Sequence, residues 1–253
     1  MFHFFVDRTQ IDEGQNRITI TGPDVNHIRN VLRMKPGEQL RVSNGEDKDY
    51  LCAVEEVSQE QVTVEILGPL ESTELPARIV LFQGLPKSDK MELIIQKAVE
   101  LGVYEIVPVA TRRAVVKLDR KKEESKLRRW NLISESAAKQ SKRLIVPQVT
   151  GVMTLEEAFS YAAGFDKCLI PYENAEGMDG TREAFASIRP GMTAGIFIGP
   201  EGGFDEEEIA RAETHGVRPV TLGKRILRTE TAGLYALSVL GFLLEGNEGD
   251  VRL

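Results

Sequence analysis

The segment Ile196–Asp205 (IFIGPEGGFD) joins an apolar run to a glycine-rich turn. The apolar run predicts a buried strand, and Asp205 with Glu208 predicts a capping box at the start of a helix. Glycines at the carboxyl end of a strand let the backbone approach a ligand closely, and open α/β sheets bind ligands at that edge. The segment has neither G-x-G-x-x-G nor the Lys-Ser/Thr of a P-loop, and Glu206–Glu208 would repel a phosphate. It therefore favours a ligand with adenine, ribose and a cationic sulfonium over a triphosphate; a glycine turn without a ligand is the alternative.

A second chemical segment is Thr221–Ala232 (TLGKRILRTETA). A strand ends at Leu222-Gly223, a basic loop carries Lys224, Arg225 and Arg228, and an apolar helix follows from Thr231. Ile226 and Leu227 inside this loop could hold the apolar face of a ring while Arg228 meets an anion. Ordinary packing at a helix start is the alternative. Two such loops at strand ends predict one shared pocket.

The elements around these loops alternate between strand and helix after Pro76, which predicts an α/β domain with a mainly parallel sheet. The expected strands are Arg78–Phe82, Glu105–Val109, Lys167–Ile170, Thr193–Ile198 and Arg218–Leu222. The expected helices are Lys87–Leu101, Arg120–Arg143, Leu155–Ala163, Thr181–Ser187, Asp205–His215 and Thr231–Leu244.

The first seventy residues are mostly strand. Tyr50–Val57 and Gln61–Leu67 alternate apolar and polar residues about a short turn, which predicts a hairpin. Arg17–Ile20 and Gln39–Val42 are further strands, and a short helix runs from Gly22 toward Met34. These elements predict a small β-barrel. The turn-rich segment Gly68–Pro76 is the expected boundary, which gives domains 1–72 and 73–253.

Charge is unevenly distributed along the 253 residues, whose net charge is −7. Residues 111–143 hold 12 Lys and Arg against four Asp and Glu. A local basic excess on an acidic protein is typical of a face that meets a polyanion. A solvated helix face is the alternative interpretation.

Composition excludes several classes of protein. The first residues, MFHFFVDR, lack the pattern of a secretory signal, so none is expected, and no apolar run reaches the length of a membrane span. The two cysteines and three histidines are scattered, so a structural zinc site is not expected. These features predict a reduced, soluble, cytoplasmic protein.

Five ordered motifs resemble one family over essentially the whole chain. They are His27–Met34 with Pro36-Gly37, Lys90–Glu92 with Gln96–Gly102, Glu135–Arg143 (ESAAKQSKR), IGPEGGF and LGKRILRTETA. Together they are similar to the RsmE family, bacterial 16S ribosomal RNA methyltransferases that modify N3 of a uridine.

The resemblance implies a PUA-like β-barrel followed by a SPOUT domain whose chain forms a deep trefoil knot, a rare exception to unknotted topology. It also implies S-adenosylmethionine as cofactor, a homodimer, and 16S ribosomal RNA in the small ribosomal subunit as partner, with no metal and no membrane. The implied cofactor-binding residues are Ile198, Gly199, Pro200, Glu201, Gly203, Leu222, Gly223, Ile226, Leu227, Arg228, Thr231 and Ala232.

Catalytic and RNA-binding residues follow from the chemistry that a uridine demands. Its N3 proton must leave, so Arg228 is expected to favour the anion, and Glu201 to orient a ligand or accept the proton. The expected RNA contacts are Arg8, Arg29, Arg33, Lys90, Arg112, Arg113, Gln140 and Arg143. Two alternatives are another SPOUT methyltransferase acting on a ribose 2′-hydroxyl or on transfer RNA, and a ribosome-assembly factor without catalysis.

Overall fold

The computed structural model describes residues 1–116, 119–175 and 177–245 of the chain. Lys117 of the basic segment and residues 246–253 of the predicted second domain lie outside these ranges. Two compact units make up the chain: the first contains Met1–Glu74 and Ala138–Val146, and the second contains the remainder. The sequence-based boundary at residue 72 stays a prediction. The mixed α/β class is confirmed.

The first unit is built on a six-stranded sheet in the order β1-β4-β5-β6-β3-β2. Its strands are β1 (Phe2–Phe5), β2 (Ile11–Asp12), β3 (Arg17–Thr21), β4 (Gln39–Ser43), β5 (Asp49–Val57) and β6 (Gln61–Pro69). The β5–β6 pair is the predicted hairpin, and β1 pairs with β4 in parallel. Over these described residues the recorded ladder begins at β1 and ends at β2, and this sheet is the counterpart of the predicted small barrel.

A buried polar network lies beside the apolar core of the first unit. His3 Nε2 is 2.6 Å from the Ser43 hydroxyl, which donates to the Asp49 carboxylate, and Asp49 also pairs with Arg41. Burial, and after it the charge of Arg41, lowers the pKa of His3 to about 3. The strand β1 was not predicted, because it has only four residues and because a polar residue, His3, occupies one of its buried positions.

The predicted helix of the first unit has two parts. An α-helical turn, α1 (Pro23–Asn26), begins with proline as expected and continues as a π-helical segment, His27–Leu32. Arg33 ends this segment with φ of 55°, in the left-handed region. π-Helical turns are rare and occur frequently at functional sites.

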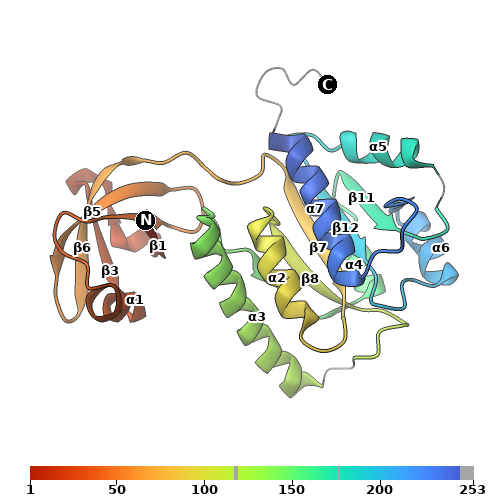
Figure 1. The fold of residues 1–253 in the computed structure, drawn as a ribbon, viewed down its shortest axis with the longest axis horizontal. Coiled ribbons are helices and arrows are strands. Elements are labelled where there is room, and N and C mark those ends of the chain that lie inside the picture. The colour runs from red at the N-terminus through yellow and green to blue at the C-terminus, as the bar shows by residue number, and fades with distance from the viewer. Residues whose placement is uncertain (117–118, 176, 246–253) are drawn as a thin grey trace. The chain divides into compact units, whose positions relative to one another are not determined.

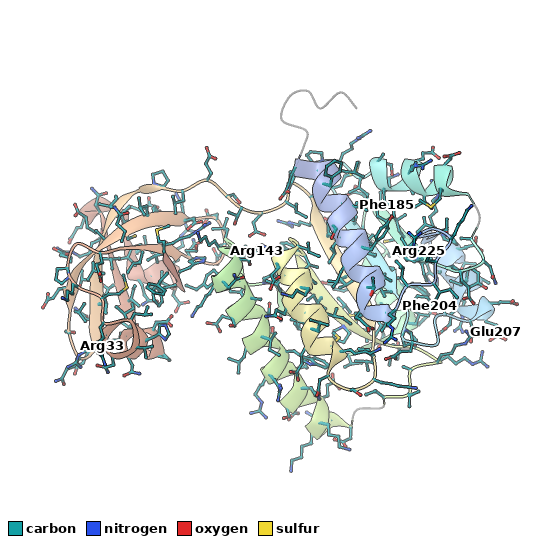
Figure 2. The ribbon with its side chains drawn as sticks, viewed as in Figure 1. Arg33, Arg143, Phe185, Phe204, Glu207 and Arg225 are labelled. Atoms are coloured by element: carbon teal, nitrogen blue, oxygen red, sulfur yellow. The ribbon has the colours of Figure 1, made fainter. Side chains whose placement is uncertain are left out.

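Arg143 helps to tie the returning segment 138–146 to the rest of the first unit. It is 3% exposed, and its guanidinium pairs with Glu74, which also accepts from the Leu144 amide. Arg143 is labelled in Figure 2. Its charge is therefore used in holding this unit together.

The second unit carries the alternating strands and helices. Its strands are β7 (Arg78–Gly84), β8 (Glu105–Ala110), β9 (Gln148–Val149), β10 (Met153–Thr154), β11 (Lys167–Pro171), β12 (Thr193–Ile198) and β13 (Arg218–Val220). Its helices are α2 (Lys90–Glu100), α3 (Arg120–Ser141, whose last residues belong to the first unit), α4 (Leu155–Ala162), α5 (Met178–Ala186), α6 (Glu206–Thr214) and α7 (Thr229–Glu245).

All pairings recorded in the sheet of the second unit are parallel, as predicted. The order is β10-β8-β7-β12-β11-β13, with β9 beside β8. The predicted strands and helices are present, but α2 begins later than expected, at Lys90, and α5 and α7 begin earlier, at Met178 and Thr229. The two-residue strands β9 and β10 were not predicted. Neighbouring β12, β11 and β13 therefore end at one edge of the sheet.

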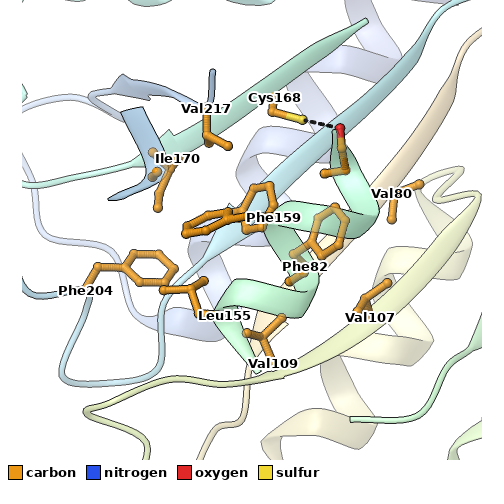
Figure 3. Close-up of a cluster of buried hydrophobic side chains, with 14 of the residues drawn as sticks. Val80, Phe82, Val107, Val109, Leu155, Phe159, Cys168, Ile170, Phe204 and Val217 are labelled. Atoms are coloured by element: carbon orange, nitrogen blue, oxygen red, sulfur yellow. Dashed lines mark hydrogen bonds between the residues drawn. The ribbon is translucent and has the colours of Figure 1, made fainter. Parts of the chain in front are cut away.

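Alternation along the strands divides the core between two faces of the sheet. Phe82 stacks on Phe197 at 4.2 Å between ring centres, and Phe159 of α4 packs against Phe197. Figure 3 labels Phe82 and Phe159 in this buried cluster. Leu81 and Ile198, which point the other way, lie next to Gly233 of α7. In Figure 1, α7 and α2 lie side by side, and α2 contacts α7. Of the described helices, none is long and apolar enough to cross a membrane.

Candidate active site

A cavity of about 750 Å³ lies at the carboxyl edge of β12, β11 and β13, inside the second unit. Its wall includes the glycine loop after β12 and the basic loop before α7, as the sequence predicts. The predicted cofactor residues all line it except Thr231, which is exposed on α7. The structure thus brings the two loops into one concave site of ligand size.

The glycine loop owes its shape to close backbone packing. A Cβ atom on Gly84, the last residue of β7, would lie 2.7 Å from the backbone nitrogen of Pro200. A Cβ atom on Gly199 would lie 3.0 Å from the Cα atom of Gly203. Only glycine fits these positions without displacing the backbone, so they fix the path of the loop.

The predicted capping box closes this loop on α6. Asp205 accepts a hydrogen bond from the Glu208 amide at 2.8 Å, and Glu208 accepts from the Asp205 amide at 2.9 Å. The backbone hydrogen bond from Glu208 is the main cause that lowers the pKa of Asp205. Both carboxylates accept hydrogen bonds from backbone amides at the start of α6, which matches the positive end of the helix dipole.

Two arginines of the β8–α3 loop hold the glycine loop from outside. The Arg112 guanidinium pairs with Asp205 and Glu207, and its amide donates to Glu208. Arg113 donates to the carbonyl of Gly202 at 2.8 Å, with its side chain across that glycine. Both were predicted as RNA contacts; the structure shows that they also support the site.

Buried hydrogen bonds join the two loops. The Thr229 hydroxyl donates to the Gly199 carbonyl at 2.6 Å and accepts from the Gln83 side-chain amide at 2.9 Å. Gln83 is fully buried at the end of β7. Neither residue was predicted, since a lone threonine and a lone glutamine give no sequence signal.

The basic loop presents its cations to solvent and to the cavity. Lys224, Arg225 and Arg228 line the cavity and are exposed, and the structure records no hydrogen bond or ion pair between their side chains and other described residues. Arg225 is labelled in Figure 2. Ile226 is 87% exposed beside them. This loop can therefore contact an anionic or aromatic group that arrives from outside.

An ion cluster lies at the wall of the cavity. Lys90 Nζ is 3.1 Å from Glu201 Oε1 and 3.1 Å from Glu230 Oε2. Burial raises the pKa of Glu201, but hydrogen bonds from its own amide, Lys90 and the Lys87 amide outweigh burial and leave it below its usual value. The two carboxylates raise the pKa of Lys90, Glu230 foremost. Glu201 is therefore ionised and already engaged.

A third loop, after β11, was missed by sequence reasoning. Pro171, Tyr172, Glu173, Ala175, Gly177 and Met178 line the cavity, and the Tyr172 amide donates to the Val220 carbonyl. The strand itself was predicted. Ligands of open α/β sheets bind at the carboxyl ends of the strands, and applying this rule to β11 would have predicted the loop.

The predicted RNA contacts divide by environment. Arg8, Arg29, Arg33 and Gln140 are exposed. Lys90 lines the cavity, and the guanidinium of Arg143 is buried against Glu74. Residue type and spacing could not distinguish these environments.

The fold and site are those of an RNA methyltransferase: residues 73–241 match the RNA methyltransferase domain, and residues 20–67 match the RNA methyltransferase PUA domain. The chain is 39% identical to the ribosomal RNA small subunit methyltransferase E of Bacillus subtilis (strain 168), over 99% of this chain and all of that protein. It belongs to that methyltransferase family, which confirms the resemblance read from its motifs.

Solved structures agree with this assignment. The ribosomal RNA small subunit methyltransferase E of Neisseria gonorrhoeae, bound to S-adenosyl methionine, is 33% identical with a TM-score of 0.81, covering 96% of this chain and 98% of that one. A Legionella pneumophila protein in complex with S-adenosylmethionine is 34% identical with a TM-score of 0.79, covering 94% and 96%. The fold is therefore shared over nearly the whole chain.

Proposed function

We propose that this chain transfers a methyl group from S-adenosylmethionine to N3 of a specific uridine in 16S ribosomal RNA, within the assembled small subunit. The observation that carries the proposal is the single cavity formed by the IGPEGGF and LGKRILRTETA loops. Family membership supplies methyl transfer to RNA. The target atom and the subunit context follow from the motif resemblance.

The cavity suits the cofactor in size and in chemistry. Ile198, Leu222 and Leu227 supply apolar wall for an adenine, and backbone groups of the glycine loop lie next to them. The carboxylates of Glu173 and Glu201 line the cavity and suit a cationic ligand. Bound there, S-adenosylmethionine supplies an activated methyl group, so the protein must chiefly bind, orient and exclude water.

The remaining chemistry falls to the residues that meet the uridine. N3 carries a proton on the Watson–Crick edge, so the base must be unpaired or flipped, and the proton must leave. Arg228, with Arg225 beside it, would stabilise the uridine anion electrostatically. Glu201 orients ligand groups; its lowered pKa and its ion pair with Lys90 make it a weak proton acceptor.

RNA would bind through exposed cations on each unit. In the first unit, Arg29 lies in the π-helical segment and Arg33 directly follows it; both are exposed, as is Arg8. In the second, Lys121 and Arg128 are exposed on α3, and Arg112 and Arg113 lie beside the glycine loop. Such contacts make affinity salt-dependent, with a log–log slope of roughly −0.7 per single-strand phosphate neutralised.

Two further features belong to the proposal. The chain would form the trefoil knot of SPOUT domains around the two loops, and it would form a homodimer through α7. Tyr235 and Phe242 are 40% and 68% exposed on that helix, so they offer apolar surface to a second copy. Replacing Phe242 with Asp is expected to yield a monomer by light scattering, with the control Ser160→Asp, exposed on α4, unchanged.

The deciding experiment incubates the purified protein and labelled S-adenosylmethionine with undermodified small subunits and, separately, with naked 16S RNA. Label in 3-methyluridine, mainly on subunits, is expected. Label in a 2′-O-methylated nucleoside or in transfer RNA would favour the other SPOUT activities. Absence of cofactor binding by calorimetry would favour a non-catalytic assembly factor.

A further inference from the structure

We propose that Lys90 is a positioning residue: it fixes the carboxylates of Glu201 and Glu230 and thereby sets the wall of the cofactor cavity, instead of contacting RNA. The inference rests on the proposed function and goes beyond it. It concerns three segments of the second unit that are far apart in the chain and meet at one ammonium group.

The geometry makes Lys90 a junction. Lys90 is the first residue of α2, Glu201 belongs to the glycine loop, and Glu230 lies in the first turn of α7. The Glu201 carboxylate also accepts from the Lys87 amide, with oxygen–nitrogen distances of 3.1 and 3.3 Å. One cation therefore ties the start of α2 to both loops that form the cavity.

The charges explain why this junction must be cationic. Both carboxylates approach the same nitrogen, so they stand within roughly 6 Å of each other, where like charges repel strongly in a partly buried site. Oε2 of Glu230 is buried, and no hydrogen bond to it is recorded among the described residues. Its recorded polar contact is the ion pair with Lys90. Without Lys90 the carboxylates would separate or one would take up a proton.

The same charges argue against a phosphate contact. Lys90 and its two carboxylates together carry a net negative charge, and the side chain of Lys90 is 28% exposed. A phosphate that approached Nζ would have to displace a carboxylate and would meet the other. Arg29 and Arg33, which are exposed, face no such competition in the recorded ion pairs.

The test compares Lys90→Met, Lys90→Arg and Lys90→Met/Glu230→Gln in the full-length protein. Lys97→Met is the matched control, because Lys97 lies on the same helix and its recorded ion pair is a local one, with Glu100. Calorimetry measures the Kd for S-adenosylmethionine, filter binding at several salt concentrations measures RNA affinity, and hydrogen exchange without cofactor reports on residues 199–205.

Lys90→Met is expected to raise the cofactor Kd tenfold or more and to speed amide exchange in 199–205. Lys90→Arg, whose fork can bridge two carboxylates, should restore both values to within about threefold. The double variant should recover a large part of the loss, because it removes the repulsion. Lys97→Met should match the wild type, and RNA affinity and its salt slope should be unchanged in all variants.

Two results would overturn the inference. One is a cofactor Kd and loop exchange in Lys90→Met within twofold of the wild type. The other is a fall of the RNA salt slope by roughly 0.7 in that variant, which marks a lost phosphate contact. If the wild type itself fails to bind S-adenosylmethionine, the proposed function fails, while the exchange comparison still decides whether Lys90 positions the loop.

Discussion

The hydroxyl of Thr229 donates a 2.6 Å hydrogen bond to the carbonyl of Gly199, 30 residues earlier in the chain. This bond joins the first residue of α7 to the glycine loop, and Gln83 of β7 completes the chain of hydrogen bonds from the other side. The glycine loop and the basic loop, which the sequence predicts separately, are thus coupled by Thr229 and Gln83, which were not predicted.

Thr229→Val should therefore damage both stability and cofactor binding. Valine preserves the shape but removes the hydrogen bond to the Gly199 carbonyl and one of the two that the buried Gln83 amide donates, the other being to the Gly84 carbonyl. Leaving such a buried polar group unsatisfied costs about 1–3 kcal/mol. Urea unfolding measures the stability, and calorimetry measures the Kd for S-adenosylmethionine. Thr231→Val, in the same helical turn but exposed, is the control and should change neither. Equal behaviour of the two variants would contradict the coupling.

Gly84→Ala should displace the glycine loop from beneath. The added methyl group would meet the backbone of Pro200 at 2.7 Å, and overpacking of this kind costs about 1–3 kcal/mol. We expect a lower melting temperature and at least a tenfold higher Kd for S-adenosylmethionine. Gly164→Ala, where the methyl group enters open space, should be neutral. A Gly84→Ala protein with wild-type affinity would show that the loop does not depend on this contact.

His3 should make the protein less stable as the pH falls below neutrality. Its pKa is about 3 in the folded protein and 6.5 otherwise, so between these values the unfolded chain binds more protons. The contribution of His3 to the free energy of unfolding is fully present above pH 6.5. It falls as the pH is lowered toward 3, by at most about 1.4 kcal/mol per pH unit. Urea unfolding at pH 7 and pH 5 should show a smaller loss for His3→Gln, whose amide can still donate to Ser43. Identical losses would exclude this origin.

Arg33→Gly should separate stability from RNA binding. Arg33 has a left-handed backbone, which costs a non-glycine residue about 1–2 kcal/mol, so glycine relieves strain while it adds flexibility to the unfolded chain. We expect an unchanged or slightly higher melting temperature together with weaker RNA binding and a shallower salt slope. Asn16→Gly, at another left-handed position, should leave RNA affinity intact. Unchanged RNA affinity in Arg33→Gly would remove this residue from the RNA surface.

Local patterns predicted most of the second unit, because apolar strands such as Thr193–Ile198 and the capping box of Asp205 carry their own signal. Features that depend on tertiary partners were not predicted. The β11 loop gives no glycine signature, and the π-helical turn after Asn26 has the composition of an ordinary helix. Charge type alone suggested RNA contacts for Lys90 and Arg143, whereas each meets a carboxylate far along the chain.

The pairing of Arg143 with Glu74 has a consequence for how this protein can be cut and recombined. Because the first unit takes in residues 138–146, it is discontinuous in sequence, and a fragment that stopped at Glu74 would expose a carboxylate stripped of its buried counterion. Grafting this first unit onto a related enzyme would need three crossovers, after residues 74, 137 and 146, not one. Because recombination at one point cannot exchange the first unit alone, we expect the two units to be inherited together and to diverge together.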